Sequence, residues 1–203
     1  MAVLSWRRKD DDARESARAE AESRARFEAL ALPLLPSLYN TARWLTRDPA
    51  EAEDLVQETM VKALGGFAGF EPGTNFKAWA FRILRNTYLT SRSGLAARRT
   101  VALEEELEAT GEPEAAVERM TPELELMRLS DRAALQRAMD ELPGPLLEVV
   151  LLCDVEEMKY REIAAVLEVP IGTVMSRVSR ARAVLREKLT AQGVRASEGG
   201  PVQ

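Results

Sequence analysis

Near the C-terminus, serine and arginine side chains recur at the spacing of one helical face. Ser176, Ser179 and Arg180 share that face, and Arg177 and Arg182 lie at its edges. An arginine can donate two hydrogen bonds to O6 and N7 of guanine, while serines and flanking arginines can reach base edges or phosphates. These residue types in this pattern predict recognition of duplex DNA through the major groove.

A helix-turn-helix would position these side chains. We predict a short helix over Tyr160–Leu167, a turn over Glu168–Pro170 and a longer helix over Ile171–Leu189. Pro170 suits the opening turn of the second helix, whereas Glu168 stands where a glycine would adopt a left-handed conformation at less cost. The two helices would pack through Ile163, Ala164, Leu167, Val174, Val178 and Leu185. An amphipathic hairpin with a solvated basic face is the alternative interpretation.

A second candidate surface is the acidic face of a helix in the N-terminal half. The pair Asp48-Pro49 is a helix start signal, and the helix should reach about Phe67. Glu51, Asp54 and Glu58 fall on one stripe of it. Taken alone, such a stripe is most simply solvated. A carboxylate metal site is a weaker alternative, because hard cations take ligands from more than one element.

A third candidate segment is a basic helix. Glycines mark a loop after the acidic helix, and helical periodicity then returns over 76–91. Trp79 shares the apolar stripe of Ile83 and Leu84, so we expect it to pack in the core. The basic residues on this helix are Lys77, Arg82 and Arg85.

Charge is distributed unevenly along the chain, whose net charge is −5. Residues 76–100 contain six bases and no acids, and residues 158–190 contain seven bases and three acids. Between them, residues 101–131 contain ten acids and two bases. Each basic part can therefore meet phosphate while the acidic connector keeps the chain soluble. Residues 101–121 lack an apolar stripe, which predicts a flexible linker.

The periodicity of the apolar residues predicts an all-α fold, because no segment of useful length has the period of a strand. We expect two small helical domains over 25–97 and 128–192, an acidic linker over 98–127, and tails over 1–24 and 193–203. The N-terminal tail should be solvated and become helical close to Phe27, since Arg7–Arg24 lacks an apolar stripe. Pro33 and Pro36 predict a kink or two shorter helices after Phe27. A further break is expected at 143–145, before a helix over 146–153.

The chain has no histidine and one cysteine. These counts remove the commonest general base and metal ligand and exclude an internal disulfide, so we expect no cofactor and no enzymatic activity such as that of a nuclease. Cys153 follows two leucines, where a small buried thiol is expected and a redox role is the alternative. No apolar run approaches the roughly 20 residues that cross a bilayer, and no cleavable leader is evident, which predicts a cytoplasmic protein without membrane contact.

Several motifs resemble those of one family. The sequences Tyr-Arg-Glu-Ile-Ala at 160–164 and Pro-Ile-Gly-Thr-Val-Met-Ser-Arg-Val-Ser-Arg-Ala-Arg at 170–182 resemble region 4 of extracytoplasmic-function sigma factors. The sequence Ala-Glu-Asp-Leu-Val-Gln-Glu-Thr at 52–59 resembles the region 2 helix that binds core polymerase. Residues 76–79 and 82–87 resemble the promoter-melting part of region 2. The order of the motifs and the linker between them also match this family.

The resemblance implies a sigma factor that directs RNA polymerase core to specific promoters and initiates transcription, in a stress response and under the control of an anti-sigma factor. Asp54, Gln57 and Glu58 match the positions that contact the coiled coil of the largest polymerase subunit. An acidic helix face would complement a basic clamp there and speed assembly.

The resemblance also assigns the DNA contacts. The loop 69–75 and the following helix would hold the non-template strand of the minus-ten element, where an extruded base needs an apolar pocket and nearby cations. The residues expected there are Asn75, Phe76, Lys77, Arg82, Arg85 and Asn86. Those expected at the minus-thirty-five element are Thr173, Ser176, Arg177, Ser179, Arg180 and Arg182. Met175 departs from the family, which often has a basic residue at that position.

A stand-alone repressor or activator is the alternative function. It would use the helix-turn-helix without polymerase, dimerise and bind a two-fold symmetric operator. The acidic helix and the segment around Asn86 would then have no role, so the sigma factor hypothesis accounts for more of the sequence.

Overall fold

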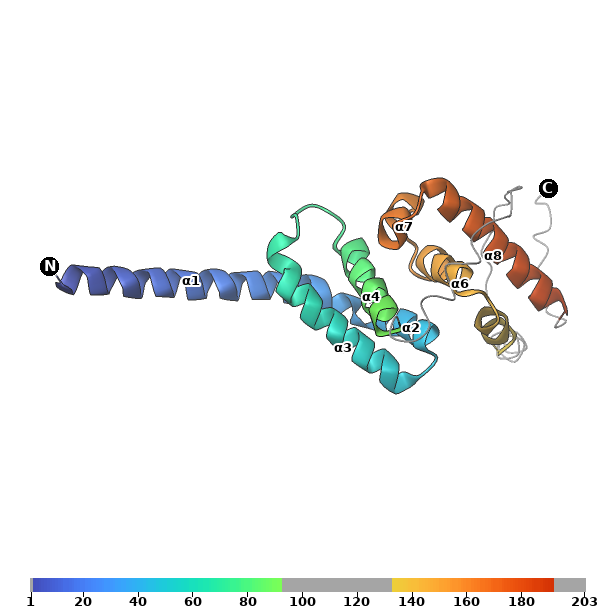
Figure 1. Cartoon of the computed structure of the whole chain (residues 1–203), viewed down its shortest axis with the longest axis horizontal. Helices are drawn as coiled ribbons and strands as arrows, with labels where there is room; N and C mark the ends of the chain where they lie inside the picture. The colour runs from blue at the N-terminus through green and yellow to red at the C-terminus, as the bar shows by residue number, and fades with distance from the viewer. Residues whose placement is uncertain (1, 93–132, 192–203) are drawn as a thin grey trace, which may run out of the picture. The chain divides into compact units, whose positions relative to one another are not determined.

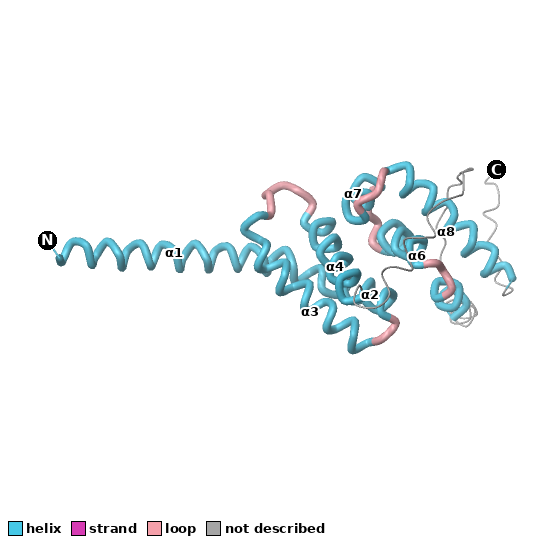
Figure 2. Tube along the Cα trace, viewed as in Figure 1, coloured by secondary structure: helices cyan, strands magenta, loops and turns pink. Residues whose placement is uncertain are grey.

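The structure, a computed structural model, describes residues 2–92 and 133–191. Side chains in these ranges are described from Arg14 onward, except Ser16. Every regular element in them is helical, which confirms the predicted all-α fold (Figure 2). The chain divides into two compact units, unit 1 (Met1–Gly94) and unit 2 (Leu95–Gln203). The predicted linker and C-terminal tail lie outside the described residues.

Unit 1 is a set of helices in which α3 packs against both α2 and α4. Its elements are α1 (Ala2–Ala31), η1 (Leu32–Leu34), α2 (Leu35–Thr46), α3 (Pro49–Gly66), η2 (Phe67–Gly69) and α4 (Phe76–Arg92) (Figure 1). The core between α2, α3 and α4 is made of apolar side chains with little or no exposure, including Leu38, Ala42, Ala52, Leu55, Ala80, Phe81 and Leu84.

Helix α1 extends further toward the N-terminus than the helix expected close to Phe27, while its described side chains before Phe27 are solvated as expected. The stretch 7–24, expected as a solvated tail, is part of this continuous helix. Alanine, arginine and glutamate favour helix, and ion pairs at four-residue spacing support it, Arg18–Glu22 at 3.0 Å and Arg24–Glu28 at 3.7 Å. The absence of an apolar stripe means that this part of the helix has no face to bury. Phe27 is accordingly the first buried residue among the described side chains.

Proline residues separate α1 from α2. The 3₁₀ turn Leu32–Leu34 contains Pro33, and Pro36 lies in the first turn of α2. A proline inside a helix removes a backbone hydrogen bond and clashes with the preceding turn, so the chain changes its helical geometry here. The predicted interruption of the helix at these prolines is confirmed.

Helix α3 begins at the predicted signal. Asp48 is its N-cap, and the Asp48 carboxylate accepts a hydrogen bond of 2.9 Å from the amide of Glu51. Pro49 occupies the first helical position, where a missing amide proton costs no intrahelical bond. Arg47, in a left-handed conformation with φ of 63°, ends α2 immediately before this cap.

An aromatic cluster lies where the end of α1 meets η2 and the start of α4. Phe27 lies 5.3 Å from Phe67, and Phe76 lies 5.3 Å from Phe70 and 5.4 Å from Trp79 between ring centroids. Several pairs meet edge to face, a geometry that the ring quadrupoles favour. The cluster joins the end of α1 to η2, the following loop and α4, and Trp79 packs against it as predicted.

Unit 2 contains the predicted helix-turn-helix. Its described elements are a helix over 133–140, α6 (Gly144–Val150), η5 (Leu151–Val155), α7 (Tyr160–Leu167) and α8 (Ile171–Ala191). The break at 143–145 is confirmed, because Pro143 is the N-cap of α6. The segment η5 is a π-helical turn, in which the amide of Glu156 donates to the carbonyl of Leu151 at 2.9 Å. The helix expected over 146–153 therefore changes pitch after Val150.

The N-cap of α3 yields a stability prediction. Replacing Asp48 with alanine should lower the free energy of unfolding of unit 1 by about 1 kcal/mol, because the amide of Glu51 loses its acceptor. Urea unfolding followed by tryptophan fluorescence reports this unit, since Trp6, Trp44 and Trp79 all belong to it. The matched control is Glu53→Ala, an exposed change on the same helix. Equal stability of the two variants would contradict the capping role.

Candidate nucleic-acid and protein interfaces

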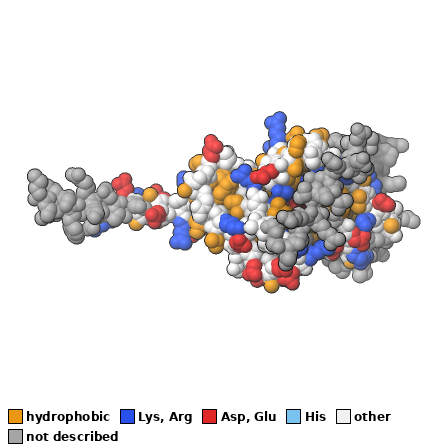
Figure 3. All heavy atoms as spheres, in the orientation of Figure 1, with side chains coloured by type: hydrophobic (Ala, Val, Ile, Leu, Met, Phe, Trp, Pro, Cys, Tyr) orange, Lys and Arg blue, Asp and Glu red, His pale blue; other side chains and the backbone are white. Residues whose placement is uncertain are grey.

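Helix α3 presents an exposed acidic face. Asp54, Gln57 and Glu58 are all exposed, and the helical repeat puts them on one side of α3. Acidic side chains gather along the lower edge of Figure 3, where α3 begins. The buried side of the helix consists of Ala52, Leu55, Val56, Thr59 and Ala63. The structure therefore brings together the three residues expected to bind a protein partner.

A cavity of ≈ 350 Å³ adjoins this acidic face, between α3 and the end of α4. It is lined by Thr46, Glu51, Asp54, Leu55, Glu58, Tyr88, Ser91 and Arg92. Three carboxylates against one guanidinium give it a negative character, which suits a basic side chain of a partner.

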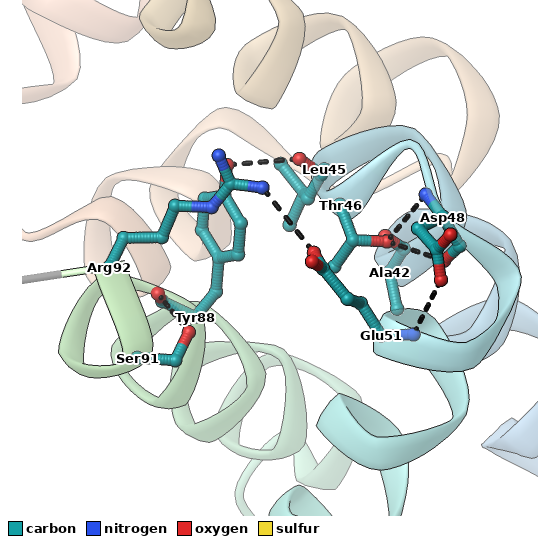
Figure 4. A network of polar contacts seen from close by, with 8 residues as sticks. All are labelled: Ala42, Leu45, Thr46, Asp48, Glu51, Tyr88, Ser91 and Arg92. Carbon is teal, nitrogen blue, oxygen red and sulfur yellow. Dashed lines mark hydrogen bonds and ion pairs between the residues drawn. The ribbon is translucent and has the colours of Figure 1, made fainter. Parts of the chain in front are cut away.

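Side chains of the cavity tie α2, α3 and α4 together (Figure 4). The hydroxyl of Tyr88 donates to the carbonyl of Leu45 at 2.9 Å. The guanidinium of Arg92 lies 5.2 Å from the centroid of the Tyr88 ring, and its Nη2 lies 3.6 Å from Oε2 of Glu51. The sequence gives no signal for these contacts of Tyr88 and Arg92, because their partners on α2 and α3 lie far away along the chain.

Helix α4 carries the basic residues expected at single-stranded DNA. Arg82 and Asn86 are exposed, Arg85 is half-buried, and the three share one side of the helix. Lys77 lies on a different side, with its Nζ 5.8 Å from the centroid of the Phe81 ring. The structure thus groups three of the four expected polar contacts of α4 and separates Lys77 from them.

Asn75 and Phe76 have structural roles at the start of α4. The Asn75 carbonyl oxygen Oδ1 accepts from the amide of Ala78 at 3.1 Å, so this side chain caps the helix. Phe76 is buried, and its ring packs among Phe27, Phe67 and Phe70. An asparagine directly before a helical segment is a capping signal, and that signal in the sequence would have identified the role of Asn75.

A smaller cavity of ≈ 190 Å³ lies beside the loop that precedes α4. Phe76 contributes to its wall, together with Arg26, Leu30, Phe67, Phe70, Pro72, Gly73 and Thr74. The lining is mostly apolar and aromatic, with one cation from α1. Gly73 has φ of 91°, which a residue with a side chain rarely adopts, so this glycine shapes the loop at the mouth of the cavity.

The helix-turn-helix forms at the predicted residues. Glu168 adopts the left-handed conformation, with φ of 56° and ψ of 41°, at the position where the sequence indicated a strained turn. The carbonyl of Pro170 accepts from the amides of Thr173 at 2.9 Å and Val174 at 3.2 Å, which opens α8. The predicted packing is confirmed by the burial of Ile163, Leu167, Val174, Val178 and Leu185, while Ala164 is half-buried.

The outer side of α8 carries the residues expected to contact duplex DNA. Thr173, Ser176, Arg177, Ser179 and Arg180 are all half-buried, and the hydroxyl of Ser176 donates to the carbonyl of Thr173 at 3.0 Å. Met175 is exposed on the same helix. Five of the six expected residues therefore lie along the N-terminal half of α8.

Arg182, the sixth, is engaged within the protein. Its Nη2 lies 2.6 Å from Oδ1 of Asp154 and its Nε lies 3.3 Å from Oδ2, so the guanidinium is held by both carboxylate oxygens. This hydrogen bonding raises the pKa of Arg182. At the far end of α8, an ion pair with Lys188 lowers the pKa of Glu141.

Cys153 adjoins this ion pair. Its sulfur lies 3.7 Å from Nη2 of Arg182, and the residue is half-buried rather than fully buried as expected. Burial, followed by the Asp154 carboxylate, raises the pKa of the Cys153 thiol to about 11. Among the described residues, no three histidine, cysteine, aspartate or glutamate side chains are grouped so that they could hold a metal ion. None of the described helices is long and apolar enough to span a membrane.

The raised pKa makes Cys153 a slow nucleophile. At pH 8 the thiolate fraction falls about a hundredfold relative to a thiol of pKa 9.0, so alkylation by iodoacetamide should be slower in the folded chain by roughly that factor. Labelling rates measured by mass spectrometry, with the urea-unfolded chain as control, check this. The folded rate should also rise about tenfold per pH unit up to pH 10. A folded rate equal to the unfolded rate would contradict the assignment.

Both units match models of one protein family. Residues 30–98 match Sigma-70 region 2, and residues 132–185 match Sigma-70, region 4. The chain is 35% identical over 152 residues to the ECF RNA polymerase sigma factor SigE of Mycolicibacterium smegmatis, over 75% of this chain but 57% of that relative. It is 34% identical over 170 residues to the ECF sigma factor EcfG of Rhodopseudomonas palustris, over 84% of this chain and 87% of that relative.

Solved structures show the same architecture. The sigma factor RpoE of Bartonella quintana, in complex with the anti-sigma factor NepR, aligns with a TM-score of 0.60 and 31% identity over 81% of this chain and 96% of that chain. CnrH, in complex with the cytosolic domain of CnrY, aligns with a TM-score of 0.58 and 27% identity over 86% of this chain and 94% of that chain. With regions 2 and 4 both present and in this order, the chain belongs to the extracytoplasmic-function group of the sigma-70 family.

Proposed function

We propose that this chain is a dissociable initiation subunit of bacterial RNA polymerase, which brings the core enzyme to specific promoters and catalyses no reaction itself. The observation that carries the proposal is the presence in one chain of an exposed acidic helix face, a basic helix and a helix-turn-helix, divided between two units. A stand-alone regulator would need only the last of these.

The acidic face of α3 is the proposed site for core polymerase. Asp54, Gln57 and Glu58 are exposed side by side, and the adjoining cavity adds Glu51 to the negative surface. A basic coiled coil would be steered to this surface by its charge, and its side chains could enter the cavity. The largest polymerase subunit supplies that coiled coil.

The basic side of α4 and the smaller cavity are the proposed sites for the minus-ten strand. Arg82 and Arg85 would contact the backbone of the non-template strand, and Asn86 would bind a base edge. The cavity beside the loop, walled by Phe70 and Phe76, offers the apolar surroundings that an extruded base requires. Asn75 caps the start of α4, and Lys77 lies over the ring of Phe81 on another side of this helix.

The outer side of α8 is the proposed site for the minus-thirty-five duplex. Arg180 donates to guanine, while Thr173, Ser176, Arg177 and Ser179 contact bases or phosphates around it. These side chains lie opposite the buried residues of α8, so the helix can enter a major groove without disturbing the packing of unit 2.

An anti-sigma factor is the proposed regulator. The sigma factor RpoE of Bartonella quintana has been solved in complex with the anti-sigma factor NepR, and the structurally similar CnrH in complex with the cytosolic domain of CnrY. A protein that covers the polymerase-binding face would keep this chain inactive until a stress signal releases it. The chain would act in the cytoplasm, where polymerase and DNA are present.

Loss of the Gln57 side chain should weaken polymerase binding. We expect Gln57→Ala to raise the dissociation constant for sigma-free core about tenfold, because an interfacial polar contact is removed without any change of charge. Titration of a fluorescently labelled chain with core measures this. Glu15→Ala, an exposed change on α1 rather than on α3, is the control. Equal affinities of the Gln57 variant and the wild type would contradict the assignment of the acidic face of α3 to core polymerase.

Loss of the Arg180 side chain should weaken duplex recognition. Arg180→Ala should reduce affinity for a selected promoter duplex about tenfold to a hundredfold, corresponding to roughly 1–3 kcal/mol for a bidentate base contact. Binding to a scrambled duplex should change less. The control is Arg186→Gln, which changes an arginine about 9 Å beyond Arg180 along the axis of α8. An equal loss on both duplexes would show that Arg180 contacts phosphate rather than a base.

A further inference from the structure

The ion pair between Arg182 and Asp154 is a feature that the proposed DNA contacts do not use. Arg182 belongs to α8, and Asp154 belongs to the π-helical turn η5, 28 residues earlier. Two donors of the guanidinium meet the two carboxylate oxygens, at 2.6 Å and 3.3 Å, which is the bidentate arrangement of a strong charge-assisted pair. The side chains are 44% and 34% exposed, so solvent still reaches both.

The position of Arg182 on α8 indicates which part of DNA it could meet. It follows Ser176 by six residues, so it lies about 9 Å further along the axis and about 120° around the helix. The N-terminal residues of a recognition helix contact base edges, and positions beyond them and to the side meet the sugar-phosphate wall of the groove. A free arginine there would contact phosphate, which carries no sequence information.

We propose that Asp154 is a specificity-determining residue, which holds Arg182 in an ion pair and so withholds a sequence-independent phosphate contact from the helix-turn-helix. The inference rests on the proposed function of α8 as the DNA-reading helix. With Arg182 neutralised, Arg180 and the nearby serines account for a larger share of the DNA affinity. The promoter is then distinguished more sharply from other DNA.

The geometry of the pair is what allows it to withhold Arg182. Solvent screens an ordinary exposed ion pair, but a bidentate arginine–carboxylate pair is held more firmly, so breaking it offsets the gain from a new phosphate contact. The size of that withheld contact can be estimated. One additional phosphate contact steepens the dependence of log K on log salt by about 0.9, which amounts to roughly fivefold in affinity at 0.15 M salt.

The test compares the full-length wild type with Asp154→Asn, Arg182→Gln and the double variant. The ligands are the tightest duplex that the wild type selects from a random library and a scrambled duplex of equal length, with dissociation constants measured by fluorescence anisotropy from 50 to 200 mM salt. Asp154→Asn should bind the scrambled duplex about fivefold more tightly at 0.15 M salt, with a salt slope steeper by about 0.9. The ratio of selected to scrambled affinity should fall. The double variant should return to the wild-type slope.

Three outcomes would overturn the inference. The first is a salt slope of Asp154→Asn that equals that of the wild type. The second is weaker binding of Asp154→Asn to the scrambled duplex, together with a lower thermal midpoint of unfolding. The third is a salt slope of the double variant that equals that of Asp154→Asn. The last would mean that the lost carboxylate charge acts without Arg182. Asp154→Ser is the second variant should Asp154→Asn fail to give a helical circular dichroism spectrum. Core-polymerase binding of the wild type is scored separately, so failure of the proposed function would not be mistaken for failure of this inference.

Discussion

The packing of α3 against α4 is the interaction on which the function of unit 1 depends. In the proposed function, one small unit presents an acidic face to a protein and a basic face to DNA without letting the two neutralise each other. Buried side chains on α3, such as Leu55 and Thr59, and on α4, such as Phe81 and Leu84, hold the helices together and direct Asp54 and Arg82 outward. The link between Arg92, Tyr88 and Glu51 adds to this packing at the end of α4.

The same principle organises unit 2. Val174, Val178, Ala181 and Leu185 bury one side of α8, which leaves Ser176 and Arg180 on the side away from the core. The left-handed Glu168 sets the turn between α7 and α8 at the cost of some backbone strain. The π-helical turn then places Asp154 beside α8, so the basic helix is partly neutralised at one point. Under the role proposed for Asp154, affinity and selectivity would be set by different residues of this motif.

Much of the fold could be predicted from local signals. Asp48 with Pro49, the break at Pro33 and the boundaries of α7 and α8 all follow from capping, proline geometry and helical periodicity. The length of helix α1 was not predicted, because an apolar stripe predicts burial, whereas alanine, arginine and glutamate can sustain an exposed helix without one. Pairings such as Tyr88 with Leu45 and Arg182 with Asp154 span 43 and 28 residues, and periodicity carries no information about them.

The central claim is that the two units act together on one promoter only when the chain is joined to polymerase. Transcription from a promoter library by sigma-free core, with and without the purified chain, tests it most directly. We predict start-site-specific transcripts only in the reactions that contain the chain. Specific duplex binding by a chain that neither joins the core nor yields such transcripts would contradict the account and favour a stand-alone regulator.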